Sequence, residues 1–260
     1  MIVDYTPVLI LLAPLIGAIV IGLLEGLLGR KAYQISALAQ LVGLGIACHV
    51  LYQVSAEEAT AITLPLITAA INPLQFGLYI DRLAAVMIVL ITTIGLIITL
   101  FSVYYMQQDR ERARFHALIS LTTFTLLCMV ASDNLLMLFA CWQLLSWLVY
   151  LLSHNYAYAP TVTGAARAYS IFRIGDIAFL VGMVLIYHLY GTLHWEPLFE
   201  RVAEEQYLFS LWPGGGTTLH ATTVITLLIF IGAMSKSVQF PMNLWLPDAL
   251  YAPTPVHALQ

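Results

Sequence analysis

Long unbroken runs of apolar residues dominate the chain and set its predicted architecture. The runs predict helices at about residues 7–29, 33–54, 83–106, 115–132, 134–152, 165–190 and 221–240. Each run is close to the ~20 residues that a helix needs, at about 1.5 Å per residue, to cross the hydrocarbon core of a bilayer. The predicted fold class is therefore an all-α integral membrane protein with about seven transmembrane helices.

The segments between the runs predict structure outside the hydrocarbon core. Residues 55–80 include many β-branched side chains and contain Pro65 and Pro73. This composition favours a short hairpin on the surface. Residues 191–220 are amphipathic at first and then glycine-rich, which predicts a surface helix followed by a flexible loop. Asp133 or Asn134 is the expected N-cap of the helix that begins at about residue 134. The first run has no cleavage pattern of a signal peptide, so we expect it to be retained as a span.

The charges of the connecting loops predict an orientation. One set of loops holds six basic residues, which are Arg30, Lys31, Arg110, Arg112, Arg114 and Arg167. The opposite set holds Arg82 and Arg201 together with most of the acidic residues. By the positive-inside rule the basic set faces the cytoplasm. The sequence therefore predicts a multi-pass protein of the cell inner membrane with a periplasmic N-terminus.

Composition supports a lipid environment and excludes several classes of function. The chain has 260 residues, of which 61% are hydrophobic and 9% charged, against roughly 25% charged residues in a soluble domain. The net charge of −4 argues against a nucleic-acid partner. The histidines and cysteines lack the paired spacings of metal sites, and no phosphate-binding or haem-binding motif occurs. No metal and no cofactor is therefore expected, and the cysteines are interpreted as packing residues: Cys48, Cys128 and Cys141.

Lys236 is the most informative polar residue within an apolar run. Insertion of an ionisable side chain into the middle of a span costs roughly 2.5–3.5 kcal/mol of free energy, so its presence needs an explanation. Pro241 follows five residues later and should break or kink the helix just beyond the lysine. A broken helix at membrane depth is tolerated where it packs in protein or lines a wet cavity, and transporters place ion sites there. An amine held in such a place can gain and lose a proton during turnover. The alternative is a lysine that snorkels to the cytoplasmic interface, and residues 237–256 are a candidate re-entrant half-helix.

Three further polar residues lie within the predicted spans. Arg173 and Asp176 are three residues apart and can pair on one helix face, either to lock two helices together or to take part in charge transfer. Gln143 can hydrogen-bond between helices but cannot titrate.

Other polar residues of the runs have simpler explanations. Glu25 lies about one turn from Arg30 and Lys31, so an interfacial ion pair is the favoured interpretation. His116 and His154 are weaker candidates for a proton wire, because histidine changes charge near neutral pH.

Four strings together resemble the antiporter-like, proton-conducting membrane subunits of complex I (subunit L), of Mrp antiporters and of DabB inorganic-carbon transporters. The resemblance extends from about Asp81 to the last residue. The strings are YIDRLAAVMIVLITTIGLIITLFSVYYM, DNLLMLFACWQLLSWLVYLL, FRIGDIAFLVGMVLIYHLYGTL and GAMSKSVQFPMNLWLPDALYAPTPV.

The resemblance implies a repeat of five helices with a buried lysine in a broken helix, coupled to an acid on a neighbouring helix. Lys236 matches that lysine, and Arg173 with Asp176 matches the charged pair of the family. The string Gly-Trp-Glu of complex I and Mrp members reads Cys141, Trp142 and Gln143 here. A glutamine cannot hold the charge that would bias Lys236, so either Asp176 serves instead or the coupling differs from that of complex I.

The length of the chain is a second departure from the family. Members continue into a second, inverted repeat, whereas this sequence ends at Gln260. We expect residues 1–114 to hold N-terminal helices and the hairpin, and residues 115–260 to form a first antiporter-like repeat that is incomplete at its C-terminal end. We expect the sequence to be either a fragment or a naturally split subunit. A half channel that lacks the second repeat should not conduct alone, so a partner chain is implied.

The sequence thus predicts a proton- or cation-translocating subunit of an energy-coupled complex, with other membrane subunits and the bilayer as partners. The candidate residues for proton translocation are Lys236, Arg173, Asp176, Gln143 and Asp248, with the helix break at Pro241. An inorganic-carbon role beside a large soluble zinc-containing DabA-type partner is one hypothesis, and a complex I or Mrp role is its rival. A purely structural, non-conducting membrane anchor is the third.

Overall fold

The computed structural model of the chain describes residues 6–28, 31–56, 61–68, 75–109, 111–153, 159–204, 207–210, 218–246 and 254–257. Its larger helices are α1 (Thr6–Leu23), α3 (Ala32–Ala56), α4 (Arg82–Tyr105), α5 (Arg112–Val130), α6 (Leu135–Ser153), α7 (Ala159–Tyr190) and α9 (Ala221–Lys236). The smaller elements are α2 (Glu25–Leu28), β1 (Ala61–Thr68), β2 (Gln75–Asp81), α8 (Trp195–Glu204), β3 (Leu208–Ser210), β4 (Thr218–His220), the 3-10 helix η2 (Met242–Trp245) and α11 (Thr254–His257).

The predicted membrane fold is confirmed, but among the residues that the structure describes six helices, rather than the expected seven, are long enough to span. These are α1, α3, α4, α5, α6 and α7, which combine at least 18 residues with high hydropathy. Helix α9 has 16 residues and at about 1.5 Å per residue falls short of the ~30 Å hydrocarbon core. The first run was expected to continue to Gly29, whereas α1 ends at Leu23 and a separate turn of helix, α2, follows.

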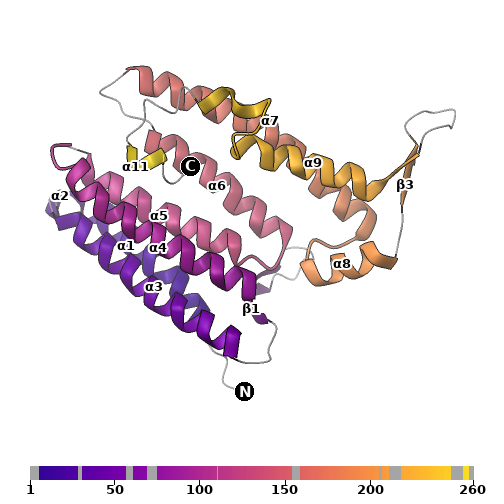
Figure 1. The fold of residues 1–260 in the computed structure, drawn as a ribbon, viewed down its shortest axis with the longest axis horizontal. Helices are drawn as coiled ribbons and strands as arrows, with labels where there is room; N and C mark the ends of the chain where they lie inside the picture. Colours follow the sequence, from indigo (N-terminus) through magenta and orange to yellow (C-terminus); the bar gives the residue numbers. More distant parts are fainter. Residues whose placement is uncertain are drawn as a thin grey trace.

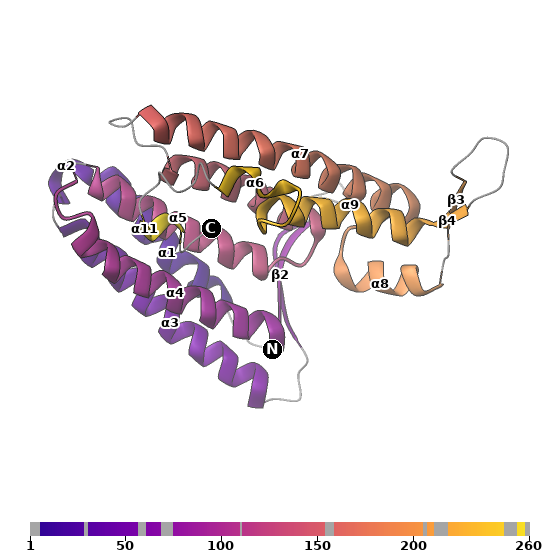
Figure 2. The same cartoon turned by 45° about the horizontal axis from the view of Figure 1, so that its top comes forward.

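The helices form two adjoining groups (Figures 1 and 2). Helices α1, α3, α4 and α5 pack together in one group, and α6, α7 and α9 form the other, with α5 and α6 in contact. The first group surrounds a core that includes Ile10, Val50 and Ile88, and the second buries Phe179 and Ile225. Because α5 also packs on α1, α3 and α4, it joins the two groups; the division of domains at residue 114 stays a prediction.

Polar side chains join α3 to α5 inside the first group. Ser36 and Ser120 share a buried hydrogen bond of 2.8 Å, and Gln40 Nε2 donates to Thr123 Oγ1 at 2.9 Å. Lipid tails are as apolar as leucine, so hydrogen bonds and close packing, rather than the hydrophobic effect, hold helices together in a bilayer. These two pairs therefore fix the rotation of α3 against α5.

The hairpin predicted between residues 55 and 80 is present as β1 and β2. The strands are antiparallel, with Ala61 opposite Asp81 and Thr68 opposite Gln75. The hairpin is not wholly superficial, because Leu78 and Ile80 are buried in the first group. Strand β2 also pairs with the α5–α6 turn: the amide of Tyr79 donates to the carbonyl of Ala131 at 2.9 Å. This pairing satisfies backbone groups that a free strand edge would leave open.

The opposite side of the same turn holds the segment that leads into α8. The amide of Leu135 donates to the carbonyl of Leu193, and the indole of Trp195 donates to the carbonyl of Ser132, both at 2.9 Å. Asn134 is the N-cap of α6, as expected, because its Oδ1 accepts from the amide of Met137 at 2.7 Å. The predicted surface helix is α8, which buries Leu198. The short β3–β4 hairpin was not predicted, and most of the expected flexible loop lies outside the described residues.

The predicted break after the seventh run is confirmed and falls at the lysine itself. Helix α9 ends at Lys236, and Val238 then takes the left-handed conformation with φ 55°, which is unusual for a β-branched residue. The chain continues through Pro241 into η2. The indole of Trp245 donates to the carbonyl of Ser235 at 3.0 Å and so satisfies one of the last carbonyls of α9. The candidate re-entrant half-helix stays a prediction, because residues 247–253 are among those that the structure does not describe.

Candidate functional site

Small residues allow α7 and α9 to approach closely, and this approach positions the end of α9. A Cβ on Gly232 would lie 2.8 Å from the Cβ of Phe179, and a Cβ on Gly175 would overlap the side chain of Ser235. Only glycine therefore fits at either position without a shift of one helix. Such small-residue contacts are how membrane helices gain packing energy. They bring Lys236, the residue after Ser235, to the side of α7 that faces α6.

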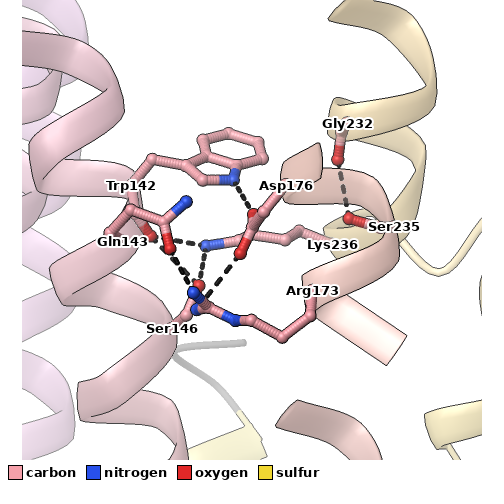
Figure 3. Close-up of polar contacts among 8 residues, drawn as sticks. All are labelled: Trp142, Gln143, Ser146, Arg173, Asp176, Gly232, Ser235 and Lys236. Carbon is pink, nitrogen blue, oxygen red and sulfur yellow. Dashed lines mark hydrogen bonds and ion pairs between the residues drawn. The ribbon is translucent and has the colours of Figure 1, made fainter. Parts of the chain in front are cut away.

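The ammonium group of Lys236 is bound by neutral acceptors on α6. It donates to the carbonyl oxygen of Trp142 at 2.7 Å and to Ser146 Oγ at 2.6 Å. The two acceptors are four residues apart and hence on one face of α6. Figure 3 shows the lysine reaching from the end of α9 to this face. A cation at a helix C-terminus is also favoured by the partial negative charge of that end.

Aromatic rings complete the surroundings of the ammonium. Its nitrogen lies 4.4 Å from the centroid of the Trp142 ring and 5.7 Å from that of Phe172, within the range of cation–π attraction. The Trp142 ring is held in place by stacking on Phe179, with centroids 5.5 Å apart. The position of the amine is therefore defined by packed side chains and not by a mobile surface.

Asp176 supplies the negative charge of the site. It is 4% exposed, and its Oδ2 lies 3.1 Å from Arg173 Nη2, which confirms that the two residues pair. Its Oδ1 accepts a hydrogen bond of 2.7 Å from the indole of Trp142. Arg173 in turn donates to Gln143 Oε1 at 2.5 Å and lies over the Tyr169 ring. The carboxylate is thus hydrogen-bonded and paired, as a buried charge requires.

The charges of the described site do not cancel. Lys236 and Arg173 contribute two positive charges, and Asp176 contributes one negative charge. Lys236 and Asp176 make no direct ion pair among the contacts within 4.0 Å; Trp142 lies between them and bonds to both. With Lys236 protonated the described cluster carries one excess positive charge, and with Lys236 neutral it carries none. The group is therefore arranged so that a single proton changes its net charge.

Four of the predicted residues meet in this cluster: Lys236, Arg173, Asp176 and Gln143 (Figure 3). Their role in proton translocation stays a prediction. Pro241 lies beyond the break, and Asp248 lies outside the described residues. Sequence reasoning missed Trp142 and Ser146, the two partners of the lysine. Trp142 and Ser146 are four residues apart and therefore share one face of α6. This spacing was the only hint in the sequence that they act together.

The other polar candidates that the structure describes are not part of the cluster. His116 is buried in α5, while His154 is not among the described residues. Glu25 is exposed at the start of α2. Of its two expected partners, Arg30 falls outside the described part of the chain, and the described Lys31 makes no ion pair with it within 4.0 Å. Cys128 is buried and Cys141 half-buried, whereas Cys48 is exposed. Within the described ranges, no group of three His, Cys, Asp or Glu side chains is arranged to hold a metal ion.

Two family models match the chain. Residues 132–260 match one described as "NADH:quinone oxidoreductase/Mrp antiporter, TM". Residues 61–116 match another described as "NADH-Ubiquinone oxidoreductase (complex I), chain 5 N-terminus". The first match includes every residue of the cluster described above.

Curated relatives share this family. The chloroplast NAD(P)H-quinone oxidoreductase subunit 5 of Brachypodium distachyon is 37% identical over 188 residues, covering 72% of this chain and 24% of that protein. NADH-quinone oxidoreductase subunit L of Neisseria meningitidis serogroup A is 32% identical over 259 residues, covering 96% of this chain and 38% of that protein. The chain thus spans between a quarter and two fifths of the length of these relatives.

Solved structures share the fold. A chain of the archaeal membrane-bound sulfane sulfur reductase superposes with a TM-score of 0.79 at 23% identity, covering 97% of this chain and 49% of that one. A chain of the Mrp complex from Dietzia sp. DQ12-45-1b gives a TM-score of 0.79 at 24% identity, covering 98% and 26%. Together with the sequence matches, this likeness places the cluster within a known architecture. The chain belongs to the NADH:quinone oxidoreductase/Mrp antiporter family of membrane subunits.

Proposed function

We propose that the protein translocates a cation, and specifically a proton, as one subunit of an energy-coupled membrane complex. The observation that carries the proposal is the Lys236 ammonium, held by neutral acceptors at the broken end of α9 beside the Arg173–Asp176 pair. An ionisable residue at such a place in a membrane protein marks an ion pathway by default.

The partners of Lys236 suit both of its protonation states. The Trp142 carbonyl and the Ser146 hydroxyl accept hydrogen bonds from the charged amine. A hydroxyl is also a donor, so Ser146 can turn its hydrogen towards the lone pair of the neutral amine. The Arg173–Asp176 pair remains neutral overall in either state. Loss of the proton therefore leaves no partner without a bond, which keeps the two states close in free energy.

We assign to Asp176 the role of the acid whose charge influences the protonation of Lys236. The position where related complex I and Mrp members are expected to carry a glutamate holds Gln143, which here accepts from Arg173. Asp176 is linked to Lys236 through the Trp142 side chain and backbone. Because Trp142 links the two groups, a change of charge at Lys236 alters the electrostatic potential at Asp176.

The partners and place of the protein follow from its relatives. Subunits 5 and L belong to NAD(P)H- and NADH-quinone oxidoreductases by name, so we assign the redox chemistry to partner subunits and the ion movement to this one. We place the chain in the cell inner membrane with the basic loops in the cytoplasm and the N-terminus in the periplasm, from the charges of the loops.

A second candidate is a DabB-type subunit that drives uptake of CO2 or bicarbonate with a zinc-containing DabA-type partner. Gln143 is the observation that favours it, because the acid expected for the complex I type is absent there. The same residue leaves room for a third candidate, an anchor that has lost conduction.

One comparison separates the three candidates. Cells that carry Lys236→Ala in the full-length protein are compared with wild-type cells for NADH-linked proton pumping, sodium tolerance and bicarbonate-dependent growth. Loss of pumping or of sodium tolerance supports the complex I or Mrp type, and loss of carbon uptake alone supports the DabB type. Unchanged values in all three assays, with normal levels of the protein, would leave the anchor and contradict ion translocation.

A further inference from the structure

A second polar site lies in the other helix group, far along the chain from Lys236. The start of α3, the end of α4 and the start of α5 enclose a pocket of about 290 Å³. Its lining residues with polar side chains are Lys31, Tyr33, Gln34, Ser102, Gln107, Arg112 and His116. None of the described residues that line it is acidic. The pocket is therefore positively charged at a depth where the apolar helices begin.

Backbone groups add to this positive charge. Helices α3 and α5 both begin at the pocket, with Ala32 and Arg112 among its lining residues. The first amide groups of a helix have no partner within it and attract anions. The N-cap of α5, Glu111, makes no side-chain bond to them. The C-terminal end of α4 carries the opposite partial charge, but this effect is weakened because the carbonyls of Ser102 and Tyr104 already accept hydrogen bonds from the amides that cap the helix.

The nearby acidic side chains are engaged elsewhere. Glu111 lies 3.5 Å from Arg114, and Asp109 accepts from the amide of Glu111 at 2.8 Å. Arg112 makes one long bond of 3.3 Å to the Gln107 carbonyl. A guanidinium has five N–H donors, so most of its capacity remains for a ligand.

His116 provides an independent sign of a missing partner. It lines the pocket and is 3% exposed, and its Nδ1 has no hydrogen-bond partner. A buried polar atom without a partner costs about 1–3 kcal/mol. An oxyanion in the pocket would accept a hydrogen bond from this imidazole.

The surface beside the pocket indicates the source of the anion. Tyr104 and Phe101 on α4 are 83% and 53% exposed, and Leu38 and Leu41 on α3 are 61% and 55% exposed. These apolar side chains belong to helices long enough to span a membrane. Acyl chains would lie along them, and lipid phosphates would lie at the level of the helix ends.

We propose that this pocket binds the phosphate headgroup of an anionic phospholipid. Lys31 and Arg112 supply the charge, the starts of α3 and α5 supply amide donors, and His116 donates from the inner wall. The acyl chains of the lipid pack on the exposed faces of α3 and α4. This site is separate from the Lys236 cluster and does not depend on the proposed ion translocation.

The test uses the full-length protein within its complex, in nanodiscs that contain spin-labelled phosphatidylglycerol or spin-labelled phosphatidylcholine. The wild type should immobilise the phosphatidylglycerol probe in preference to the phosphatidylcholine probe. Lys31→Gln with Arg112→Gln should lower that preference at least about tenfold, since each basic residue near the surface contributes to anionic-lipid affinity. His116→Phe, which keeps an aromatic ring but removes the donor, should lower it less. Arg82→Gln, an exposed basic residue at the opposite end of α4, is the matched control and should leave it unchanged.

Two results would overturn the proposal. An equal preference in the wild type and the Lys31→Gln, Arg112→Gln variant would show that the pocket does not select the lipid. Displacement of the phosphatidylglycerol probe by millimolar inorganic phosphate would show a site for free phosphate and not for a lipid. Persistence of the preference in excess inorganic phosphate is the result expected.

Discussion

The ammonium of Lys236 lies 4.4 Å from the centroid of the Trp142 ring and 2.7 Å from the carbonyl oxygen of the same residue. The indole N–H of Trp142 donates instead to Asp176 Oδ1 at 2.7 Å. One residue of α6 thus contacts both the cation at the end of α9 and the acid of α7. This relationship gives each side chain of the site a distinct, testable role.

Trp142→Phe keeps an aromatic ring over the amine but removes the donor to Asp176. A hydrogen bond to a charged group contributes about 1.5–3 kcal/mol, so we expect a lower Tm and proton transport slowed about tenfold. The measurement is thermal unfolding and proton flux of the purified complex. Trp147→Phe, on the same helix and half exposed, is the control. Equal flux in Trp142→Phe and Trp147→Phe would contradict a role for the indole.

Asp176→Asn removes the single acid of the described cluster and leaves Lys236 and Arg173 without a counter-charge. Removal of one partner of a buried pair costs about 3–5 kcal/mol, and partial exposure of Arg173 puts the expected loss at the low end. Arg173→Gln combined with Asp176→Asn should restore part of the stability. Unfolding of the two single variants and the double variant in detergent measures this, and strictly additive losses would show that the two residues do not interact.

Gln143→Glu places a second carboxylate beside Arg173, where Gln143 now accepts a bond of 2.5 Å. The added negative charge stabilises the protonated form of the cluster. The pH at which transport is half-maximal should therefore rise, by about one unit for each 1.4 kcal/mol of added attraction. Gln143→Leu removes the same acceptor without adding charge, and its pH profile should stay near that of the wild type. Coincident profiles for Gln143→Glu and the wild type would contradict the charge balance proposed for the site.

Gly232→Ala tests the close contact of α7 and α9. The new methyl group would lie 2.8 Å from the Cβ of Phe179, so the helices must separate and carry Lys236 away from α6. Overpacking of this kind costs about 1–3 kcal/mol. We expect lower Tm and lower transport. Gly22→Ala, where a Cβ meets nothing within 4 Å, should lose neither. A Gly232→Ala protein as stable and as active as Gly22→Ala would refute the packing argument.

The spans and the break could be predicted from sequence because they depend on local patterns. A run of apolar residues in lipid has few alternatives to a helix, and Pro241 cannot continue one. The pairing of Arg173 with Asp176 followed from their spacing. The end of α1 at Leu23 was missed, because Glu25 and the glycines beside it were counted as part of the run.

The partners of Lys236 could not be predicted in the same way. Which face of α6 meets α9 depends on the rotation of each helix, and this is set by contacts distant in sequence, such as Gly232 against Phe179. Ser146 was inconspicuous because a serine within a helix usually bonds to its own backbone. It does so here, to the Trp142 carbonyl at 3.1 Å, while also accepting from Lys236. The pocket at His116 likewise depends on three helix ends that only the fold brings together.

The decisive measurement is whether protons still cross the membrane when the amine of Lys236 is removed. The complex that contains the full-length protein is reconstituted in liposomes, energised by its own reaction, and followed with a pH-sensitive dye. Lys236→Met keeps a long side chain but removes the amine, and Arg82→Met is the matched surface control. We expect proton uptake to disappear in Lys236→Met, with the complex still assembled, and to persist in Arg82→Met. Wild-type uptake in an assembled Lys236→Met complex would contradict it.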